Sequence, residues 1–401
     1  MSHLASRDAW STQVAGPRPR QSSTLVNTHT DFLIVGGGIA GLRAALSLAS
    51  FGRVLILTKA SASESNTRYA QGGIAAALGP GDSPALHLRD TLEAGDGLCD
   101  ESAVRALVTT GPRYVEELVE WGVRFDCEPS GQLAFGLEAA HSVRRVLHAG
   151  DATGREIGRV LWQRVVALPS IETLDHVLVV RLIERDGVVR GARVFDSDGR
   201  STEVTAGATL LATGGAGQVF RETTNPGVAT GDGVALAYHA GARVADLEFV
   251  QFHPTALNKF GSPRFLLSEA LRGEGARLVN AHGDHFMTRC HPAGDLAPRD
   301  VVARGIVAEI ERSQGPVFLT LAHLEAAVAK SPWLAGAAIS AADIVVFPWI
   351  QLLLRAAGKE AAKPLNLGFL PLATRYPHLA AWVKRIEAIP GYERTYPPHW
   401  R

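Results

Sequence analysis

The stretch DFLIVGGGIAGLRAALSLASFGRVLILTKASASESNTRYAQGG, residues 31–73, determines the fold that we expect for this chain. Phe32 to Val35 form a short apolar run that is typical of a buried strand. Apolar residues then recur with the period of an amphipathic helix, at Leu42, Ala45, Leu46 and Ala49. A second apolar run, Val54 to Leu57, completes the pattern of a βαβ unit.

Three glycines, Gly36, Gly38 and Gly41, lie between the first strand and the helix. In a G-x-G-x-x-G turn the first glycine permits the tight turn and the second lets the backbone approach a pyrophosphate. The third lets helix and strand pack closely. With a strand on each side of the helix, we expect a dinucleotide here rather than a purely structural turn. The expected cofactor-binding residues of this turn are Gly36, Gly37, Gly38, Ile39, Ala40 and Gly41.

The second strand ends at Thr58-Lys59, where a standard NAD site has an acidic residue for a ribose hydroxyl. This difference argues against an ordinary NAD pocket. Lys59 could instead meet a 2′-phosphate, so the motif alone leaves NADP open.

The composition of the chain limits the classes of protein to which it can belong. The chain has 401 residues, of which 46% are hydrophobic, and this predicts two or three domains with a large core. Lys and Arg number 40, as do Asp and Glu, so we expect no basic stripe for nucleic acid. No apolar run suffices to span a bilayer; the nearest, 339–354, is interrupted by Asp343, Pro348 and Gln351. Three widely spaced cysteines suit a reducing compartment, and we expect a cytoplasmic protein.

Residues 1–29 are rich in Ser, Thr and Arg and have no apolar signal-peptide core, so they predict a disordered tail. A transit peptide is the alternative interpretation. Residues 84–125 predict helices, with an apolar face at Val115, Leu118, Val119 and Val123. Cys99 and Cys127 have no partner motif, and we expect small buried side chains. Strand patterns follow at 176–182, 188–195 and 208–211.

The run SNTRYAQGGI, residues 65–74, resembles the FAD-binding segment of the flavoprotein family of succinate dehydrogenases, fumarate reductases and L-aspartate oxidases. The resemblance implies that FAD, rather than NADP, is the ligand. Covalent succinate dehydrogenases have a His where Asn66 stands, so non-covalent FAD is implied. The further cofactor-binding residues implied are Lys59, Asn66, Thr67, Arg68, Tyr69, Ala70, Gln71, Gly72, Gly73, Thr213, Gly214 and Asp232. For Asp232, a Gly-rich turn with an Asx contact explains the same pattern.

FGLEAAHSVRRVLHAGDATG, residues 135–154, offers a carboxylate, two histidines and an Arg pair, which suit either a surface loop or an anion site. It is similar to the E-G-G-H-S-x-R-R-x-L-H-A-x-D-A-T-G run of L-aspartate oxidases. Glu138 stands where that resemblance implies a glutamate facing the substrate ammonium. Because a carboxylate repels a dicarboxylate that has no amine, Glu138 favours an amino-acid substrate. The Gly-Gly of the family is Ala139-Ala140 here.

From residue 246 the resemblance implies the family's capping domain. FHPTAL supplies His253, SEALRGEGA supplies Ser268, and LAPRDVVAR supplies Arg299. By resemblance His253 and Ser268 bind the substrate carboxylates. Arg299 can grip a carboxylate through two hydrogen bonds and is implied to exchange a proton at the substrate carbon. A purely electrostatic role for Arg299 is the alternative.

A cluster of His282, His285, Cys290 and His291 has no standard zinc spacing, and we expect no metal. The resemblance ends near residue 320, and the family's later substrate and FAD motifs do not occur in this sequence. Ser340 to Asp343 form an S-x-x-D helix-start signal. Leu379, Trp382, Val383 and Ile386 predict an apolar helix face that ends at Pro390-Gly391. The segment 323–401 is similar to the C-terminal helical domain of glutathione transferases, and its origin is open.

The expected fold is α/β: an incomplete Rossmann-like FAD-binding domain, a partial α+β capping domain and an all-α GST-like segment. The expected boundaries are 1–29 for the tail, 30–245 for FAD binding, 246–322 for capping and 323–401 for the helical segment. The implied activity is FAD-dependent oxidation of L-aspartate to iminoaspartate, with O2 or fumarate as acceptor. This is the first step toward quinolinate in NAD biosynthesis, which suggests quinolinate synthase as a partner. The alternatives are a soluble fumarate reductase- or succinate dehydrogenase-like flavoprotein and a catalytically impaired flavin-binding protein.

Overall fold

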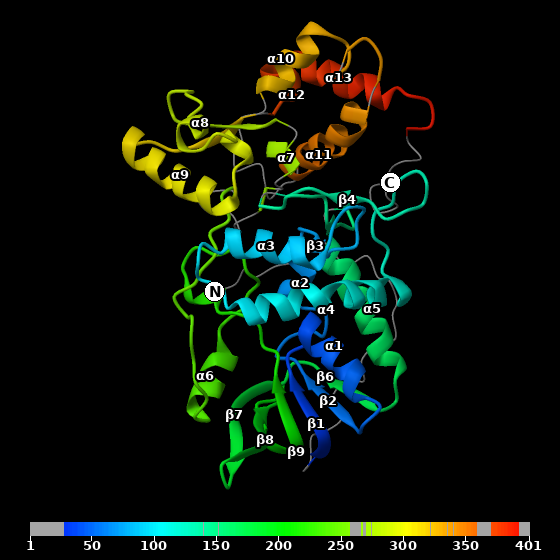
Figure 1. Cartoon of the computed structure of the whole chain (residues 1–401), viewed down its shortest axis with the longest axis vertical. Helices are drawn as coiled ribbons and strands as arrows, with labels where there is room; N and C mark the ends of the chain where they lie inside the picture. The colour runs from blue at the N-terminus through cyan, green and yellow to red at the C-terminus, as the bar shows by residue number, and fades with distance from the viewer. Residues whose placement is uncertain are drawn as a thin grey trace, which may run out of the picture. The chain divides into compact units, whose positions relative to one another are not determined.

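The structure is a computed structural model, and it divides into two compact units with the boundary after Val250 (Figure 1). Each unit has hydrophobic cores of its own. The structure describes residues 28–138, 140–150, 152–256, 266–267, 270–273, 275–320, 322–334, 336–339, 341–358 and 370–392.

A six-stranded sheet forms the centre of the first unit, in the order β6-β2-β1-β9-β8-β7. The strands are β6 (Ile171–Leu174), β2 (Val54–Leu57), β1 (Thr28–Val35), β9 (Ser201–Leu211), β8 (Val188–Phe195) and β7 (Leu178–Arg185). The first four are parallel, whereas β8 and β7 continue the sheet antiparallel. The helices of this unit are α1 (Ile39–Leu48), α2 (Asn66–Tyr69), α3 (Pro84–Ala94), α4 (Glu101–Glu120), α5 (Thr153–Ala167), the 3-10 turn η1 (Gly217–Val219) and α6 (Asp232–His239). A small sheet has the order β3 (Ile74–Ala75), β5 (Val146–Leu147), β4 (Phe135–Gly136).

The predicted βαβ unit is confirmed. β1 and β2 pair in parallel from Phe32 opposite Val54 to Val35 opposite Leu57, with α1 between them in the chain. On α1 Leu42 and Ala45 are buried, and Leu46 and Ala49 pack against the same core. The strand starts earlier than expected, at Thr28, because the two residues assigned to the tail pair with β9. The rest of that predicted tail lies outside the described residues.

The prediction for β9 was too short, the prediction for β7 was shifted toward the N-terminus, and β6 was missed. β9 starts at Ser201 rather than at residue 208, because the polar half of the strand pairs antiparallel with β8. β7 starts at Leu178 rather than at His176, whose backbone has a positive φ of 56°. β6 has only four residues, and its assignment depends on backbone pairing with β2. Backbone pairing, which leaves no periodic side-chain signal, decides all three cases.

Helices α3 and α4 confirm the helical prediction for residues 84–125. Val115, Leu118 and Val123 are buried, but Val119 is exposed. The expectation of buried cysteines is wrong, because Cys127 is exposed and Cys99 only half-buried. Cys99 lies in the loop after α3, where its thiol is 3.7 Å from the carbonyl oxygen of Thr91.

The second unit contains two separate cores. Leu278, Phe286, Met287, Ala297 and Val302 form one of them, in the part that ends with β11. The elements of that part are α7 (Ala270–Gly273), β10 (Arg277–Val279), α8 (Met287–Cys290), the 3-10 turn η2 (Gly294–Leu296), α9 (Arg299–Ser313) and β11 (Phe318–Thr320). The helices that follow are α10 (Ala322–Lys330), α11 (Ala341–Gly358), α12 (Leu372–Arg375) and α13 (Pro377–Glu387).

The helices after residue 321 enclose the other core, and the predicted apolar face of α13 is confirmed. All four apolar residues predicted for α13 are buried, with Trp382 fully so. α11 starts at Ala341, within the S-x-x-D signal, while Ser340 lies outside the described residues. Asp343 accepts hydrogen bonds from the Leu334 amide at 2.8 Å and from the Trp382 indole at 2.7 Å. This buried carboxylate therefore ties α11 to α13 as well as marking a helix start.

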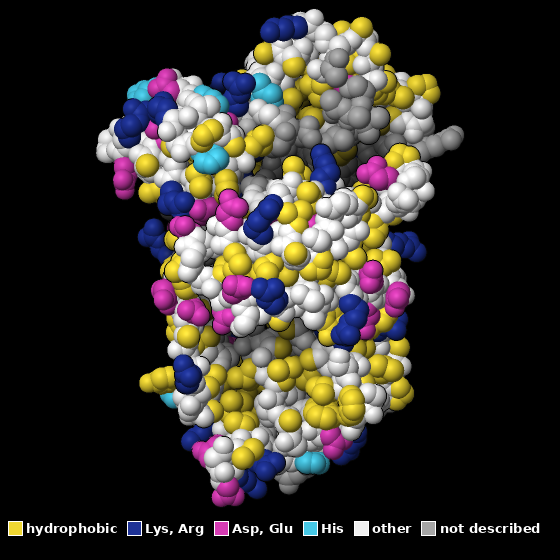
Figure 2. Space-filling model, viewed as in Figure 1, with side chains coloured by type: hydrophobic (Ala, Val, Ile, Leu, Met, Phe, Trp, Pro, Cys, Tyr) yellow, Lys and Arg dark blue, Asp and Glu magenta, His cyan; other side chains and the backbone are white. Residues whose placement is uncertain are grey.

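Charged side chains of both signs are interspersed on the face shown in Figure 2, and histidines gather over α8 and α9. This pattern agrees with the balanced composition. Among the described residues, no helix has both the length and the apolarity needed to cross a bilayer.

Glu309 on α9 gives the second unit a pH dependence that can be measured. Its carboxylate accepts hydrogen bonds from Arg312, Asn280 and Arg289 at 2.5–2.9 Å. The hydrogen bonds from Arg312, the largest cause, and from Asn280 and Arg289 lower the pKa of Glu309 from 4.5 to about 2. Burial of the carboxylate opposes this shift but does not outweigh it. Because the folded pKa is below the unfolded one, this stabilisation is full above about pH 4.5 and is lost as the pH falls toward 2.

Replacing Glu309 with Gln is therefore expected to lower the free energy of unfolding at pH 7 and to flatten its dependence between pH 4.5 and 2. Urea unfolding followed by tryptophan fluorescence over this pH range measures both effects. Glu311→Gln is the control, because Glu311 is exposed on the same helix. A Glu309→Gln variant with the wild-type pH slope would contradict the assignment.

Candidate dinucleotide site and the Glu138 loop

The glycines of the β1–α1 turn have different surroundings, which separate structural from ligand-facing positions. A β-carbon on Gly36 would lie 2.2 Å from the Ala212 carbonyl oxygen, and one on Gly41 would lie 2.0 Å from the Gly36 carbonyl oxygen. One on Gly37 would lie 2.8 Å from a Thr58 methyl group. At Gly38 the nearest atom would be the Thr67 hydroxyl at 3.6 Å, an ordinary contact. Gly38 therefore keeps the start of α1 open, as a pyrophosphate requires.

The later predicted cofactor residues lie at the same edge of the sheet. Ala212, directly after β9, donates its amide to the Val35 carbonyl at 2.8 Å. A β-carbon on Gly233 would lie 1.8 Å from the Thr213 hydroxyl. One on Gly214 would lie 3.8 Å from the amide nitrogen of Asn66. Segments far apart in the chain therefore meet where the parallel strands end.

Lys59 and Asp232 contact each other directly. The Lys59 ammonium lies 2.5 Å from the Asp232 carboxylate and also donates to the Thr230 hydroxyl. Burial alone would raise the pKa of Asp232, but hydrogen bonds from Lys59 and Thr230 outweigh it and lower that pKa. The positive charge of Lys59 is thus balanced by a protein carboxylate, which weakens the case for a 2′-phosphate partner.

The loop predicted to lie along the flavin contains the short helix α2. The Thr67 hydroxyl accepts a hydrogen bond from the Ile39 amide at 3.1 Å and so links this loop to the start of α1. Tyr69 donates to Glu64 at 3.0 Å, and Arg68 lies 3.9 Å from the same carboxylate. Burial, followed by the bond to Glu64, raises the pKa of Tyr69. Tyr69 and Arg68, two of the predicted cofactor-binding residues, therefore both contact Glu64 of the same loop.

The predicted cofactor residues suit a large surface-bound ligand. Many of them are exposed on the unit that carries them, including Ile39, Ala40, Asn66, Arg68, Tyr69, Ala70, Gly72 and Gly214. Gly38 is open to a ligand, and the N-terminal amides of α1 attract negative charge. The residues present fit the diphosphate of a dinucleotide.

Glu138 follows β4 and lies within hydrogen-bond distance of His148, which follows β5. The Glu138 carboxylate lies 3.1 Å from Nε2 of His148, and both side chains are about one-third exposed. Ala140 has a φ of 68°, a conformation that favours glycine. This explains why the resembling family has glycine there. Ala139 lies outside the described residues.

The Arg pair of this loop has two different roles. Arg144 is exposed, whereas Arg145 is fully buried between Asp82 and Asp90. The sequence left open a surface loop and an anion site, and the exposed Arg144 agrees with the surface loop. The anions held by Arg145 are carboxylates of the protein itself.

The three residues predicted to bind the substrate carboxylates belong to the second unit. Arg299 is half-buried as the first residue of α9. Nδ1 of His253 accepts a hydrogen bond from the Thr255 amide at 3.3 Å. Ser268 lies outside the described residues. The roles of these residues stay predictions.

The histidine-rich cluster has ordinary partners. His285 lies 2.5 Å from the Asp295 carboxylate, whose other oxygen accepts the Leu278 amide. Within the part of the chain that the structure describes, no group of three His, Cys, Asp or Glu residues could hold a metal ion. A cavity of about 500 Å³ beside α10 contains none of the predicted site residues; it is lined by Arg277, Thr320, Ala322, His323, Ala326, Ala327 and Lys330.

Sequence reasoning missed several residues that shape the site. Gly154, the second residue of α5, lies against α2, because a β-carbon there would lie 2.0 Å from the Thr67 carbonyl oxygen. The A-T-G string at the start of this helix was the available signal. His148, Asp82 and Asp90 had no local signal, since their partners are 10, 63 and 55 residues away.

The fold and the turn of β1 and α1 define an α/β dinucleotide-binding protein. The chain belongs to the FAD binding domain family, whose model matches residues 31–362. This membership identifies FAD as the cofactor and replaces the NADP alternative.

Relatives with known names are similar to this chain over most of its length. The L-aspartate oxidase of Nostoc sp. is 53% identical over 285 residues, which are 71% of this chain and 49% of that enzyme. The L-aspartate oxidase of Agrobacterium fabrum is 46% identical over 334 residues, 83% of this chain and 61% of that enzyme. The chain spans about half the length of the first of these curated relatives.

Chains of a fumarate reductase and of an Sdh1 complex are among the solved structures that are similar to this chain. FrdA of E. coli quinol fumarate reductase is 33% identical, with a TM-score of 0.70 over 74% of this chain and 54% of that one. Sdh1 of Mycobacterium smegmatis is 33% identical, with a TM-score of 0.64 over 75% of this chain and 53% of that one.

Exchanging single glycines for alanine separates ligand contact from folding. Gly38→Ala is expected to keep the wild-type melting temperature but to weaken FAD binding by roughly tenfold or more, because the added methyl group faces the diphosphate. Gly41→Ala is the matched variant and is expected to destabilise the protein, because its methyl group would strike the Gly36 carbonyl. FAD fluorescence quenching and thermal unfolding measure the two effects. Wild-type FAD affinity in Gly38→Ala would rule out this position for the diphosphate.

Proposed function

We propose that this chain carries the FAD-binding part, and part of the substrate site, of an L-aspartate oxidase. The reaction oxidises L-aspartate to iminoaspartate with O2 or fumarate as the acceptor, a step toward quinolinate in NAD biosynthesis. The observation that carries the proposal is the 53% identity to an L-aspartate oxidase. The partly exposed Glu138 on the fold of that family supports it.

Each predicted site residue has a role in this chemistry. FAD, when bound, takes up the hydride that leaves Cα of the substrate. Glu138 would hold the ammonium group, which loses a proton as the C=N bond forms. His253 and Ser268 would bind the two carboxylates. Arg299 would orient a carboxylate through two hydrogen bonds and exchange a proton at the substrate.

Glu138 provides the discrimination between amino acid and plain dicarboxylate. A carboxylate that faces an ammonium group gains a charge-assisted hydrogen bond, whereas succinate offers it only hydrogen atoms on carbon. The Glu138 carboxylate lies 3.1 Å from Nε2 of His148, and this contact restricts the orientation of the carboxylate. Substrate selection on this basis is electrostatic and needs no change in pocket shape.

The visible flavin spectrum tests the activity directly. Under anaerobic conditions L-aspartate is expected to bleach the flavin of the purified chain, whereas succinate leaves it oxidised. After denaturation the flavin is expected to separate from the polypeptide, because Asn66 replaces the histidine of covalent relatives. A flavin that stays attached would refute non-covalent binding, and a flavin that aspartate never bleaches would refute the oxidase.

Replacing Glu138 with Gln tests the amine contact. The aspartate concentration for half-maximal spectral change is expected to rise roughly 10- to 100-fold. This rise corresponds to the loss of a hydrogen bond between charged groups, which contributes about 1.5–3 kcal/mol. Perturbation of the spectrum by succinate is expected at the same or a lower succinate concentration, because the substitution removes a carboxylate that repels a plain dicarboxylate. Glu128→Gln is the matched control, because Glu128 is an exposed carboxylate of the same unit. Equal effects on both ligands would exclude contact with the amine.

Two other functions are alternatives to the oxidase. The likeness to FrdA at 33% identity favours a fumarate reductase- or succinate dehydrogenase-like flavoprotein, which bleaching by succinate alone would select. The second alternative is a flavin-binding protein without turnover. Tight flavin binding with no spectral response to either dicarboxylate would select that function.

We also propose that residues 323–401 form a GST-like helical domain that serves as a helical plug or a contact surface between copies. The separate core of α10, α11 and α13 supports this. The described cysteines are free thiols, which supports a cytoplasmic location. Quinolinate synthase is the partner that the proposed product suggests.

A further inference from the structure

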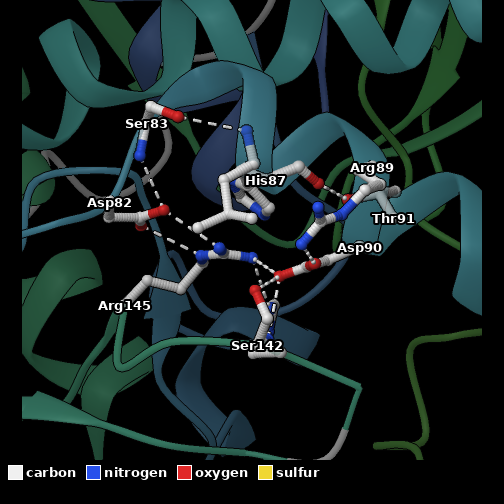
Figure 3. A network of polar contacts seen from close by, with 10 residues as sticks. Asp82, Ser83, His87, Arg89, Asp90, Thr91, Ser142 and Arg145 are labelled. Carbon is white, nitrogen blue, oxygen red and sulfur yellow. Dashed lines mark hydrogen bonds and ion pairs between the residues drawn. The ribbon is translucent and has the colours of Figure 1, made fainter.

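A buried charge network fixes the start of β5. Nε and Nη2 of Arg145 donate to the two oxygens of Asp82 at 3.0 and 2.9 Å, and Nη1 donates to Asp90 at 2.7 Å (Figure 3). The side chains of Arg145 and Asp82 are fully buried and that of Asp90 is 5% exposed. Because Asp82 precedes α3 and Asp90 lies on it, the guanidinium joins β5 to this helix.

The two carboxylates of the network accept further hydrogen bonds. Asp90 accepts the amide and the hydroxyl of Ser142 at 2.9 and 2.7 Å, and Asp82 accepts the Ser83 amide at 2.8 Å. Burial alone would raise the pKa of Asp90, but the bonds from Ser142 and Arg145 lower it below its ordinary value. The Asp90 carboxylate therefore stays charged beside the guanidinium, which a neutral side chain could not replace.

The backbone of Arg145 links all three strands of the small sheet. Its amide donates to the carbonyl of Gly136 in β4, and its carbonyl accepts the amide of Ala76, which follows β3, each at 3.1 Å. Glu138 follows β4 by two residues and His148 follows β5 by one. The position of the Arg145 side chain therefore sets where the Glu138–His148 pair lies.

His141 connects the network to Glu138 by a second path. Its amide donates to the Glu138 carbonyl at 3.3 Å, and its Nδ1 lies 3.1 Å from Nη1 of Arg145. Since a guanidinium can only donate, Nδ1 of His141 must accept, so the ring is neutral. Burial, followed by the charge of Arg145, lowers the pKa of His141, in agreement with this tautomer.

We propose that Arg145 is a positioning residue: acting through His141 and β5, it holds the Glu138 carboxylate where it meets the amine of the substrate. This rests on the proposed function, in which Glu138 binds the ammonium group. Arg145 itself touches neither substrate nor cofactor in this scheme. Its function is to make the loop of residues 138–145 rigid before the substrate arrives.

The test uses three variants of the full chain loaded with FAD. Arg145→Lys keeps the charge but loses the fork that reaches both carboxylates. His141→Phe keeps an aromatic ring but removes Nδ1, and it leaves both aspartates paired with Arg145. This variant is therefore expected to fold even if Arg145→Lys does not. Arg144→Lys is the matched control, because Arg144 is the exposed neighbour.

The readout is the flavin spectrum during anaerobic titration with L-aspartate and, separately, with succinate. Arg145→Lys and His141→Phe are expected to raise the aspartate concentration for half-maximal change about 10- to 100-fold, with succinate and FAD affinity unchanged. Arg144→Lys is expected to match the wild type. A role in folding alone would instead weaken both ligands and FAD together, and that result would overturn the proposal.

A double-mutant cycle separates this inference from the proposed function. If His141 acts through Glu138, then His141→Phe has no further effect in a Glu138→Gln background. Additive effects would overturn the inference while leaving the amine contact in place. A wild-type protein without an aspartate response, or a Glu138→Gln variant without an effect, would overturn the proposed function, and the inference with it.

Discussion

Helix α1 packs so closely on the turn before it that residue 41 has no room for a β-carbon. The Gly36 carbonyl oxygen would lie 2.0 Å from such an atom, and Gly36 itself has a φ of 114° with Ala212 against it. This contact fixes both the direction of α1 and the distance between its first turn and the ends of β1 and β9. Every other predicted cofactor segment is placed relative to that turn.

The parallel order of β2, β1 and β9 explains why distant segments meet there. The carboxyl ends of parallel strands lie at one edge of a sheet, so the turns after these strands become neighbours. The Gly36 amide donates to the Leu57 carbonyl, and the Ala212 amide donates to the Val35 carbonyl. Lys59, which follows β2, thereby comes within reach of Asp232, 173 residues later in the chain. The carboxylate partner of Lys59 thus follows from topology rather than from a local motif.

The sequence predicted those features that leave a local or periodic signal. The βαβ unit, the apolar face of α13 and the separate roles of Gly38 and Gly41 all follow from spacing over a few residues. Arg145 could not be assigned in this way, because its carboxylate partners precede it by 63 and 55 residues. An Arg pair in a polar run gives no indication of which member is buried. Likewise β6 is recognisable only by its pairing with β2.

The conformation of the Glu138 loop has an intrinsic cost that the Arg145 network offsets. Ala140 adopts a left-handed backbone with a φ of 68°, which costs a residue with a β-carbon about 1–2 kcal/mol relative to glycine. Hydrogen bonds that involve charged groups contribute about 1.5–3 kcal/mol each, and Arg145 makes three of them with Asp82 and Asp90. The network is thus strong enough to hold a strained loop in one conformation. A loop held in this way loses little entropy when a ligand binds, so the stabilisation gained in the buried cluster favours binding at Glu138.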